Sequence, residues 1–245
     1  MKTVVIIPAR LASTRFPGKP LAEIGGKTVV QRVYEQASRA RRLDQVIVAT
    51  DDERIFQHVE SFGGQVMMTR PEHQSGTDRC AEVAWRIDEA DAIINIQGDE
   101  PFIAPEQIDL VAEPLARRQG VQISTLARRI SLEEELHNPN IVKVVFNRQQ
   151  MALYFSRSTI PYLRGVPTEQ WLSAGVFYKH IGLYGFRREV LMDVTRMEQS
   201  RYEQLESLEQ LRWLEAGINI FVNITETETI GIDTPEDLER ARAWL

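Results

Sequence analysis

Short apolar runs alternate along this chain with longer segments whose apolar residues recur every three or four positions. Residues 3–7 and 92–96 are apolar runs rich in β-branched side chains, which predicts strands buried on both faces of a sheet. Residues 28–41 carry valine and alanine at four-residue steps, which predicts a helix. The hydrophobic pattern therefore switches between the periods of a strand and of a helix.

The same pattern extends over most of the chain. Further strands are expected at residues 45–50, 66–68, 121–130, 142–146, 152–155, 180–186 and 218–222. Further helices are expected at residues 51–60, 77–87, 105–117, 132–136, 188–196, 202–216 and 234–244. Residues 160–177, which contain several prolines and glycines, are expected to form a loop or flap.

Strands that alternate with helices predict βαβ units. We expect an α/β fold with a mostly parallel central sheet and helices on both faces. Beyond Gly120 three strands follow one another nearly in series, which predicts a small antiparallel lobe within about residues 121–186. No flexible linker interrupts the sequence, so residues 1–245 are expected to form a single domain.

A loop with three cations separates the first strand from the first helix. Arg10, Arg15 and Lys19 lie close together, and Pro17 and Pro20 stiffen the segment and exclude a helix there. Ligands of open α/β sheets bind at the carboxyl ends of strands, so a polyphosphate is the expected ligand, and a solvated surface loop is the alternative. No Walker or G-x-G-x-x-G motif is present, so the site would rely on cationic side chains.

Two acids are candidates for a metal site. Asp99 closes the strand at residues 92–96, where its carboxylate would face the crevice that contains the cationic loop. Mg²⁺ prefers carboxylate and phosphate oxygens, and a turn-forming aspartate is the alternative. Asp233 precedes a helix that Thr234 and Asp237 already cap, so its carboxylate is spare. The sequence leaves open whether the two acids meet in space.

The composition limits the class of protein. A formal net charge of −6 argues against a general binder of nucleic acid or of anionic membranes. The single cysteine, Cys80, excludes an intrachain disulfide and is expected to pack on a helix. No apolar segment approaches the length of a membrane span, and no signal peptide precedes Val4, so the cytoplasm is the expected location.

Residues 8–21 resemble the signature loop of sugar-activating cytidylyltransferases, and the most similar family is that of the 3-deoxy-manno-octulosonate (Kdo) cytidylyltransferases. The blocks at residues 97–101 and 208–212 extend the resemblance. It implies an Mg²⁺-dependent enzyme that transfers CMP from CTP to the anomeric hydroxyl of Kdo and releases pyrophosphate. The product, CMP-Kdo, would serve lipopolysaccharide synthesis, and the enzyme would be a homodimer.

The resemblance also assigns roles to individual residues. Asp99 and Asp233 would ligate Mg²⁺ and would form the catalytic group together with Arg10 and Lys19. The residues expected to bind the nucleotide are Ala9, Arg10, Ser13, Arg15, Lys19, Gln74, Ser75 and Gln97. Ser75 with Asp78, or Thr77 alone, could instead cap the helix that follows.

Five further residues are expected to bind the sugar: Arg157, His180, Tyr184, Glu209 and Gln210. Arg157 suits the sugar carboxylate, and an ordinary surface ion pair is its alternative. His180 and Tyr184 share one face of a strand, and a structural histidine and a core tyrosine are the alternatives. A helix over residues 202–216 would place Glu209 on an apolar stripe, where a buried ion pair is the alternative.

Two departures from the family pattern leave the identity of the sugar open. Residues 201–203 are Arg-Tyr-Glu where Pro-Leu-Glu is common, and the loop at residues 162–176 also diverges. The same reaction on the 8-amino analogue of Kdo is therefore an alternative. A non-catalytic nucleotide sensor and an acylneuraminate cytidylyltransferase are further alternatives. The complete set of cations and acids argues against the sensor, and the blocks at residues 97–101 and 208–212 favour Kdo.

Overall fold

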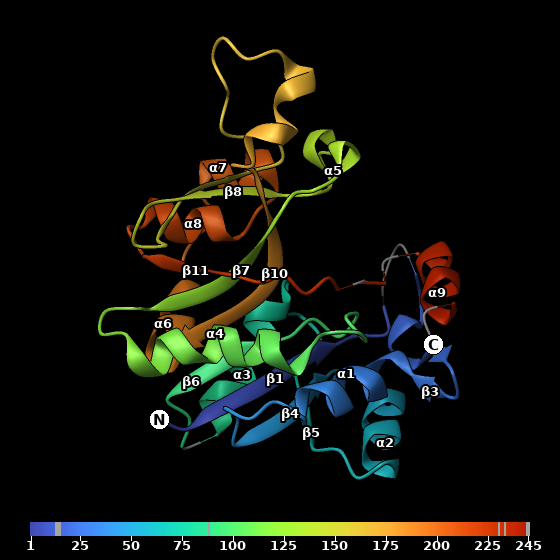
Figure 1. Ribbon diagram of the computed structural model, residues 1–245. Coiled ribbons are helices and arrows are strands. Elements are labelled where there is room, and N and C mark those ends of the chain that lie inside the picture. Colours follow the sequence, from blue (N-terminus) through green and yellow to red (C-terminus); the bar gives the residue numbers. More distant parts are fainter. Residues whose placement is uncertain (13–15, 88, 230, 233, 244–245) are drawn as a thin grey trace.

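Figure 1 shows the computed structural model of the chain, which describes residues 1–12, 16–87, 89–229, 231–232 and 234–243. The predicted site residues Ser13, Arg15 and Asp233 lie outside the described residues. Within the described part, the main sheet has nine strands and a second sheet has two.

The elements follow the alternation seen in the sequence. The main sheet contains β1 (Thr3–Ala9), β4 (Gln45–Thr50), β5 (Val66–Met68), β6 (Ala92–Asn95), β7 (Ile123–Arg129), β8 (Lys143–Phe146), β9 (Ala152–Ser156), β10 (Tyr178–Arg187) and β11 (Ile220–Ile224). The second sheet pairs β2 (Glu23–Ile24) with β3 (Lys27–Thr28). The α-helices are α1 (Val29–Ala37), α2 (Glu53–Ser61), α3 (Gly76–Arg86), α4 (Pro105–Arg117), α5 (Glu133–His137), α6 (Arg188–Val194), α7 (Arg201–Glu206), α8 (Gln210–Glu215) and α9 (Pro235–Arg242). The short 3₁₀ helices are η1 (Lys19–Leu21), η2 (Thr168–Gln170) and η3 (Leu172–Ala174).

The strand order of the main sheet is β11-β7-β10-β6-β1-β4-β5. β1 is parallel to both of its neighbours, β4 and β6, as expected for βαβ units. β10 runs antiparallel between β6 and β7, and β8 pairs with β10 and β9. The predicted α/β class is confirmed, and the structure adds that one antiparallel strand lies inside the central sheet.

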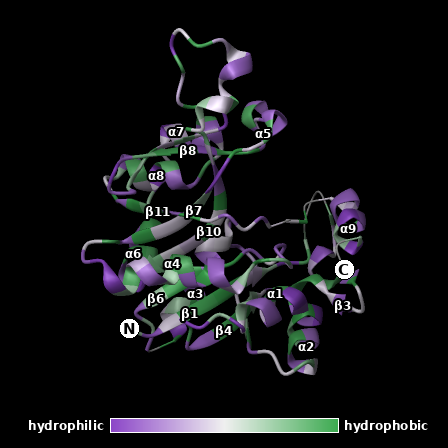
Figure 2. Cartoon of the chain, in the orientation of Figure 1, coloured by the Kyte–Doolittle hydropathy of each residue, from purple (hydrophilic) through white to green (hydrophobic). Residues whose placement is uncertain are grey.

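Helices cover both faces of the sheet. Alternate side chains of β1 point to opposite faces, so both sets of side chains are buried beneath helices. Val4 and Ile6 belong to an apolar cluster that includes residues of α3, α6 and α8. Val5 and Ile7 belong to a second cluster, which includes residues of α1, α2 and α4. Figure 2 shows hydrophobic residues along the central strands and more hydrophilic ones on the helices. The continuous apolar run at the start of the chain is thus explained by burial on two faces.

A lobe extends from the sheet at the upper part of Figure 1. β8 and β9 form an antiparallel pair there, and α8 packs against β9. The loop predicted at residues 160–177 forms the tip and contains η2 and η3. Trp171 stacks on Phe177, and both pack with Ile130 and Leu136, so the base of the tip has a small apolar core of its own.

The helix predicted at residues 202–216 is wrong as a continuous element. The chain forms α7 and α8 instead, with Ser207 between them in the left-handed conformation at φ 52°. The carbonyl oxygens of Glu206 and Ser207 accept hydrogen bonds from the guanidinium group of Arg157, at 2.6 Å and 3.3 Å. Leu205 is consequently 71% exposed, and the apolar stripe expected to contain Glu209 does not form.

The C-terminal part of the chain returns to the first loop. Ile232 and Leu238 of the α9 region pack with Ile24 of β2 and Val29 at the start of α1. The backbone amide of Ile232 donates to the carbonyl oxygen of Asp99 at 2.8 Å. Among the described residues, no helix has the length and apolar character needed to cross a membrane.

Candidate active site

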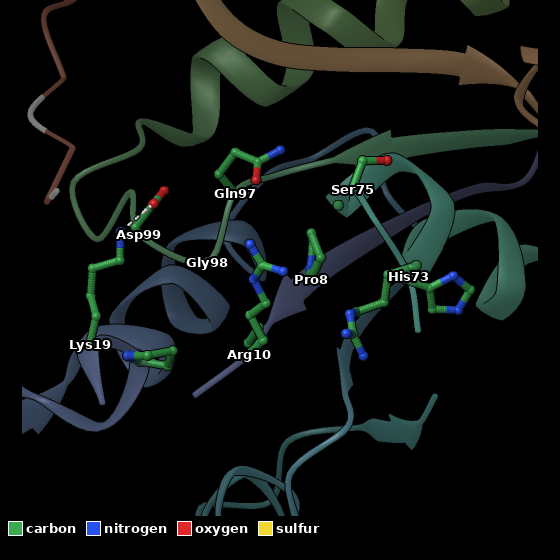
Figure 3. A pocket seen from close by; sticks show the side chains of 12 residues that line it. Pro8, Arg10, Lys19, His73, Ser75, Gln97, Gly98 and Asp99 are labelled. Carbon is green, nitrogen blue, oxygen red and sulfur yellow. Dashed lines mark hydrogen bonds and ion pairs between the residues drawn. The ribbon is translucent and has the colours of Figure 1, made fainter. Parts of the chain in front are cut away.

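A cavity of about 200 Å³ opens at the carboxyl ends of β1 and β6, where the sequence predicted a ligand site (Figure 3). The loops after these two strands and the start of α3 form its walls. The lining residues are Pro8, Ala9, Arg10, Lys19, Pro20, His73, Ser75, Gly76, Arg79, Gln97, Gly98 and Asp99. The predicted site residues that the structure brings together here are Ala9, Arg10, Lys19, Ser75, Gln97 and Asp99.

Lys19 and Asp99 form an ion pair in this cavity. Nζ of Lys19 donates to Oδ2 of Asp99 at 2.6 Å, as Figure 3 shows. Lys19 begins η1, and Gly18 before it adopts φ 79°, which glycine does without strain. Arg10, whose side chain is exposed, follows the end of β1 and lines the same cavity. Two cations and one acid therefore meet at the carboxyl ends of adjacent parallel strands.

Gly98 allows Asp99 to reach this position. A Cβ atom at residue 98 would lie 2.8 Å from the carbonyl oxygen of Pro8 in β1. A separation below 3.0 Å requires the backbone of one strand to move, so only glycine permits the observed approach. The close approach of the two strand ends sets the distance between the cationic loop and Asp99.

Glu100 adds a second carboxyl group beside Asp99. Its Oε2 atom is buried and has no hydrogen-bond partner among the described residues. Burial raises the pKa of Glu100 to about 8, and the negative charge of Asp99 contributes to the same rise. Glu100 was not among the predicted site residues. A carboxyl group with this pKa is protonated at neutral pH, so Glu100 contributes a neutral group next to the charged carboxylate of Asp99.

The residues present fit a divalent cation. The side chain of Asp99 is 32% exposed within a cavity that also contains cations for phosphate. The hydrogen bond from Ile232 to Asp99 brings the segment that leads to Asp233 alongside Asp99. Among the described residues no group of three or more His, Cys, Asp or Glu side chains forms a metal site. Mg²⁺ needs only one or two protein carboxylates, because phosphates and waters complete its coordination.

The start of α3 forms the opposite wall of the cavity. The hydroxyl oxygen of Ser75 accepts a hydrogen bond from the amide of Asp78, and the amide of Ser75 donates one to the carboxylate of Asp78, so the capping alternative holds for Ser75. Gln97 lies next to Gly76, where a Cβ atom would be 3.3 Å from Oε1 of Gln97. Gln74 is exposed, bonds to the carbonyl oxygen of Glu72, and does not belong to the cavity lining.

The structure adds His73 and Arg79 to the candidate residues. Both line the cavity, and neither was among the predicted site residues. Arg79 is 3% exposed and pairs with Asp51 at 3.1 Å, and His73 bonds to Glu82. The sequence signal that could have identified them is their position in the polar segment 73–79, which also contains Gln74 and Ser75. Their partners come from other elements, which sequence spacing cannot reveal.

Glu209 connects the lobe with the start of α3. Its Oε2 accepts from Oγ1 of Thr77 at 2.8 Å, and its Oε1 accepts from Arg212 at 3.0 Å and from Ser75 at 3.4 Å. Ser75 lines the cavity, so its hydrogen bond places the carboxylate of Glu209 next to a residue of the cavity wall. The ion pair with Arg212 is the alternative that the sequence raised, and it forms, but part of the side chain remains exposed at 26%.

His180 and Tyr184 lie next to each other on β10, with ring centroids 5.3 Å apart. Nε2 of His180 pairs with Oγ1 of Thr125 at 2.9 Å, and burial lowers the pKa of His180 to about 3. Tyr184 is 8% exposed, and its hydroxyl has no hydrogen-bond partner among the described residues. Burial, and then the charge of Glu209, raise the pKa of Tyr184 well above its ordinary value. A buried hydroxyl without a partner is available for a ligand.

None of the five predicted sugar-binding residues, Arg157 and Gln210 included, is among the residues that line the cavity. The guanidinium group of Arg157 donates to the carbonyl oxygens of Glu206, Ser207 and Pro139, and within the described part of the chain it has no carboxylate partner. Arg157 thereby fixes the break between α7 and α8, directly before Glu209. Gln210 follows Glu209 and is 5% exposed.

Comparison with known proteins defines the class to which this fold and site belong. The sequence profile of the cytidylyltransferase family matches residues 4–224. The structure also superimposes with a TM-score of 0.93 on that of a CMP:2-keto-3-deoxy-manno-octonic acid synthetase in complex with CTP, at 45% identity over 100% of this chain and 98% of the other.

Two relatives carry the comparison further. The 3-deoxy-manno-octulosonate cytidylyltransferase of Parabacteroides distasonis is 56% identical over 100% of this chain and 98% of its own length. That of Bacteroides thetaiotaomicron is 54% identical over the same shares. The chain belongs to the 3-deoxy-manno-octulosonate cytidylyltransferase family.

Proposed function

We propose that this protein transfers CMP from CTP to the anomeric hydroxyl group of Kdo and releases pyrophosphate. The observation that carries the proposal is the pairing of Lys19 with Asp99, next to Arg10, in a cavity at the carboxyl ends of β1 and β6. This charge arrangement suits a triphosphate, and family membership supports CTP as its source.

Arg10 and Lys19 would bind the phosphates and would stabilise the negative charge that develops on pyrophosphate as it leaves. Ser13 and Arg15 belong to the same loop and are proposed to assist. Ala9 and Gln97, with the segment that contains Gln74 and Ser75, would hold the nucleoside. Positioning and charge neutralisation supply most of the catalysis in phosphoryl-group transfer, so a covalent intermediate is not required.

Asp99 and Asp233 are proposed to hold Mg²⁺. Bound there, the ion would neutralise phosphate charge and lower the pKa of the attacking sugar hydroxyl. Lys19 already donates to Asp99, so its ammonium group would also orient this carboxylate.

Glu209, Gln210, His180, Tyr184 and Arg157 are proposed to bind the sugar acid. The free hydroxyl of Tyr184 and the partly exposed carboxylate of Glu209 suit the hydroxyl groups of an octulosonate. The neutral ring of His180 would accept or donate one hydrogen bond without adding a charge. Arg157 is proposed as the carboxylate partner, in addition to its bonds with the backbone.

The reaction is tested by release of pyrophosphate from CTP with Kdo, with its 8-amino analogue and without sugar. We expect turnover with Kdo and dependence on Mg²⁺. Preference for the amino sugar would assign the alternative substrate, and no release with either sugar would refute the proposal.

Replacement of Asp99 by alanine tests its role in metal binding. Asp99→Ala should lower kcat at least a hundredfold, because the proposed metal loses one of two carboxylates. Asp109→Ala is a control, because the Asp109 carboxylate lies outside the cavity, where it accepts hydrogen bonds from the backbone amides of Arg41 and Arg42. Wild-type activity of Asp99→Ala would remove this residue from the site.

We also propose that the protein acts as a homodimer in the cytoplasm. Exposed apolar side chains occur on β9, on α7 and in the loop at residues 160–177, with Leu153 at 61%, Leu205 at 71% and Tyr162 at 75% exposure. Exposed apolar surface of this kind supports association with a second copy.

A further inference from the structure

Thr77 has a hydroxyl group that helix capping does not use. Ser75 and Asp78 form the reciprocal capping box at the start of α3, so the first turn has its usual partners. Thr77 is 4% exposed, and its Oγ1 donates to Oε2 of Glu209 at 2.8 Å. A buried threonine in the first turn of one helix thus contacts an acid that lies 132 residues further along the chain.

The contact with Thr77 constrains the orientation of the Glu209 carboxylate. Arg212 and Ser75 donate to Oε1, and Thr77 is the described donor to Oε2. A carboxylate oxygen accepts two hydrogen bonds, so Oε2 can still receive one from a ligand. Without Thr77, the carboxyl group could turn about its terminal bond, because that torsion has a broad minimum.

Several groups determine the protonation of Glu209. Burial raises its pKa, and the hydrogen bond from Thr77 is the largest opposing effect, ahead of the charge of Arg212. Asp78 on α3 and Glu203 on α7 raise the pKa by charge repulsion. Tyr184 and Cys80 also face Glu209, and its charge contributes to the raised pKa of each. The hydrogen bond from Thr77 therefore opposes the rise in the pKa of Glu209 that burial and the neighbouring acids cause.

We infer that Thr77 is a positioning residue for sugar recognition, which orients the Glu209 carboxylate so that it can accept hydrogen bonds from sugar hydroxyls. The inference rests on the proposed function, since it concerns the sugar substrate of that reaction. It also explains why the first turn of α3, next to the nucleotide cavity, carries a second hydroxyl that its cap does not require.

Replacement by valine tests the inference, because valine has a similar shape and lacks the hydroxyl group. Thr77→Val should raise KM for the sugar about tenfold, because a hydrogen bond to a charged group is lost, and should change KM for CTP less than twofold. The acid limb of the pH profile of kcat/KM for the sugar should move to higher pH, because the pKa of Glu209 rises. Thr77→Ser, which keeps the hydroxyl, should restore both properties.

Thr195→Val provides the matched control. The hydroxyl of Thr195 donates to the carbonyl oxygen of Leu191 in α6 and does not contact Glu209, so both kinetic parameters should remain at the wild-type values. If the valine variant does not fold, Thr77→Ala against Thr77→Ser gives the same comparison. CTP affinity, measured by calorimetry, reports whether the nucleotide cavity is intact in each variant.

Two outcomes would overturn the inference. An unchanged KM and pH profile in Thr77→Val would show that Glu209 needs no help from the hydroxyl. An equal rise of KM for CTP and sugar would indicate general damage to α3. Both are distinct from failure of the proposed function, in which the wild-type protein itself would release no pyrophosphate.

Discussion

Lys19 has two proposed roles, which are to bind phosphate and to orient the carboxylate of Asp99. Its ammonium group neutralises Asp99 at 2.6 Å, and the side chains are 11% and 32% exposed, so the pair is shielded on one side and open to the cavity on the other. A bound triphosphate would share this cation, and a metal on Asp99 would reduce the need for it. Lys19 is thus the side chain that links the predicted phosphate loop to the predicted metal acid.

Lys19→Ala should lower kcat/KM for CTP by roughly a hundredfold, because one preorganised cation is removed from the leaving pyrophosphate. Steady-state kinetics at saturating sugar would measure the change. Lys27→Ala is the matched control, since Lys27 is an exposed lysine that pairs with Glu35 outside the cavity. An unchanged kcat/KM in Lys19→Ala would separate the lysine from phosphate binding.

His180 should make stability depend on pH. Burial lowers its pKa from 6.5 to about 3, so between these values the unfolded chain binds a proton that the folded chain does not. The free energy of unfolding should therefore rise as pH increases through this window and level off above it. His180→Gln should show a flatter rise in urea denaturation series between about pH 4 and pH 7. Parallel curves for the two proteins would contradict the prediction.

At the scale of elements, prediction succeeded where local signals determine structure. The bounds of β5 and α4 agree with those predicted, because proline at the first position marks the start of α4 and β-branched or apolar runs mark the strands. The break between α7 and α8 was missed, because its cause is distant. Arg157, from the end of β9, bonds to the carbonyl oxygens that a continuous helix would have used. Local periodicity contains no information about such a partner.

Gly98→Ala tests how closely β1 and β6 must approach. The added methyl group would lie 2.8 Å from the carbonyl oxygen of Pro8, so the unfolding free energy should fall by about 1–3 kcal/mol and kcat should fall with it. Gly182→Ala in β10 is the control, because a Cβ atom there meets no atom of the described residues within 4 Å. Urea denaturation and pyrophosphate release measure the two effects. Equal stability of the two variants would show that the strand ends can separate freely.

At the scale of the molecule, the sequence predicted the edge of the sheet where the site lies. Arg10, Lys19 and Asp99 follow β1 and β6, which are parallel neighbours, so the carboxyl ends of these strands bring the three side chains to the same edge of the sheet. The contact of Glu209 with Thr77 did not follow, since it depends on how the lobe packs on α3. The single domain over residues 1–245, with a lobe at about residues 121–186, stays a prediction, as do the individual site roles.

The proposed homodimer predicts a sedimentation mass of two chains at micromolar concentration. Leu205→Glu or Leu153→Glu should shift the mass toward one chain, because a charge replaces apolar surface at the expected interface. Trp85→Ala is the control, since Trp85 is also 71% exposed but belongs to α3 and not to the lobe. A single-chain mass for the wild-type protein would refute the dimer.

The two ends of the described chain lie on different sides of the sheet (Figure 1). Met1 precedes β1 at the amino ends of the parallel strands, whereas α9 packs with Ile24 and Val29 beside the phosphate loop. A purification tag or a surface linker attached after α9 would therefore extend from the side of the sheet on which the cavity lies. One attached before Met1 would leave that side free, which makes the amino end the better anchor for immobilising this protein on a biosensor or resin.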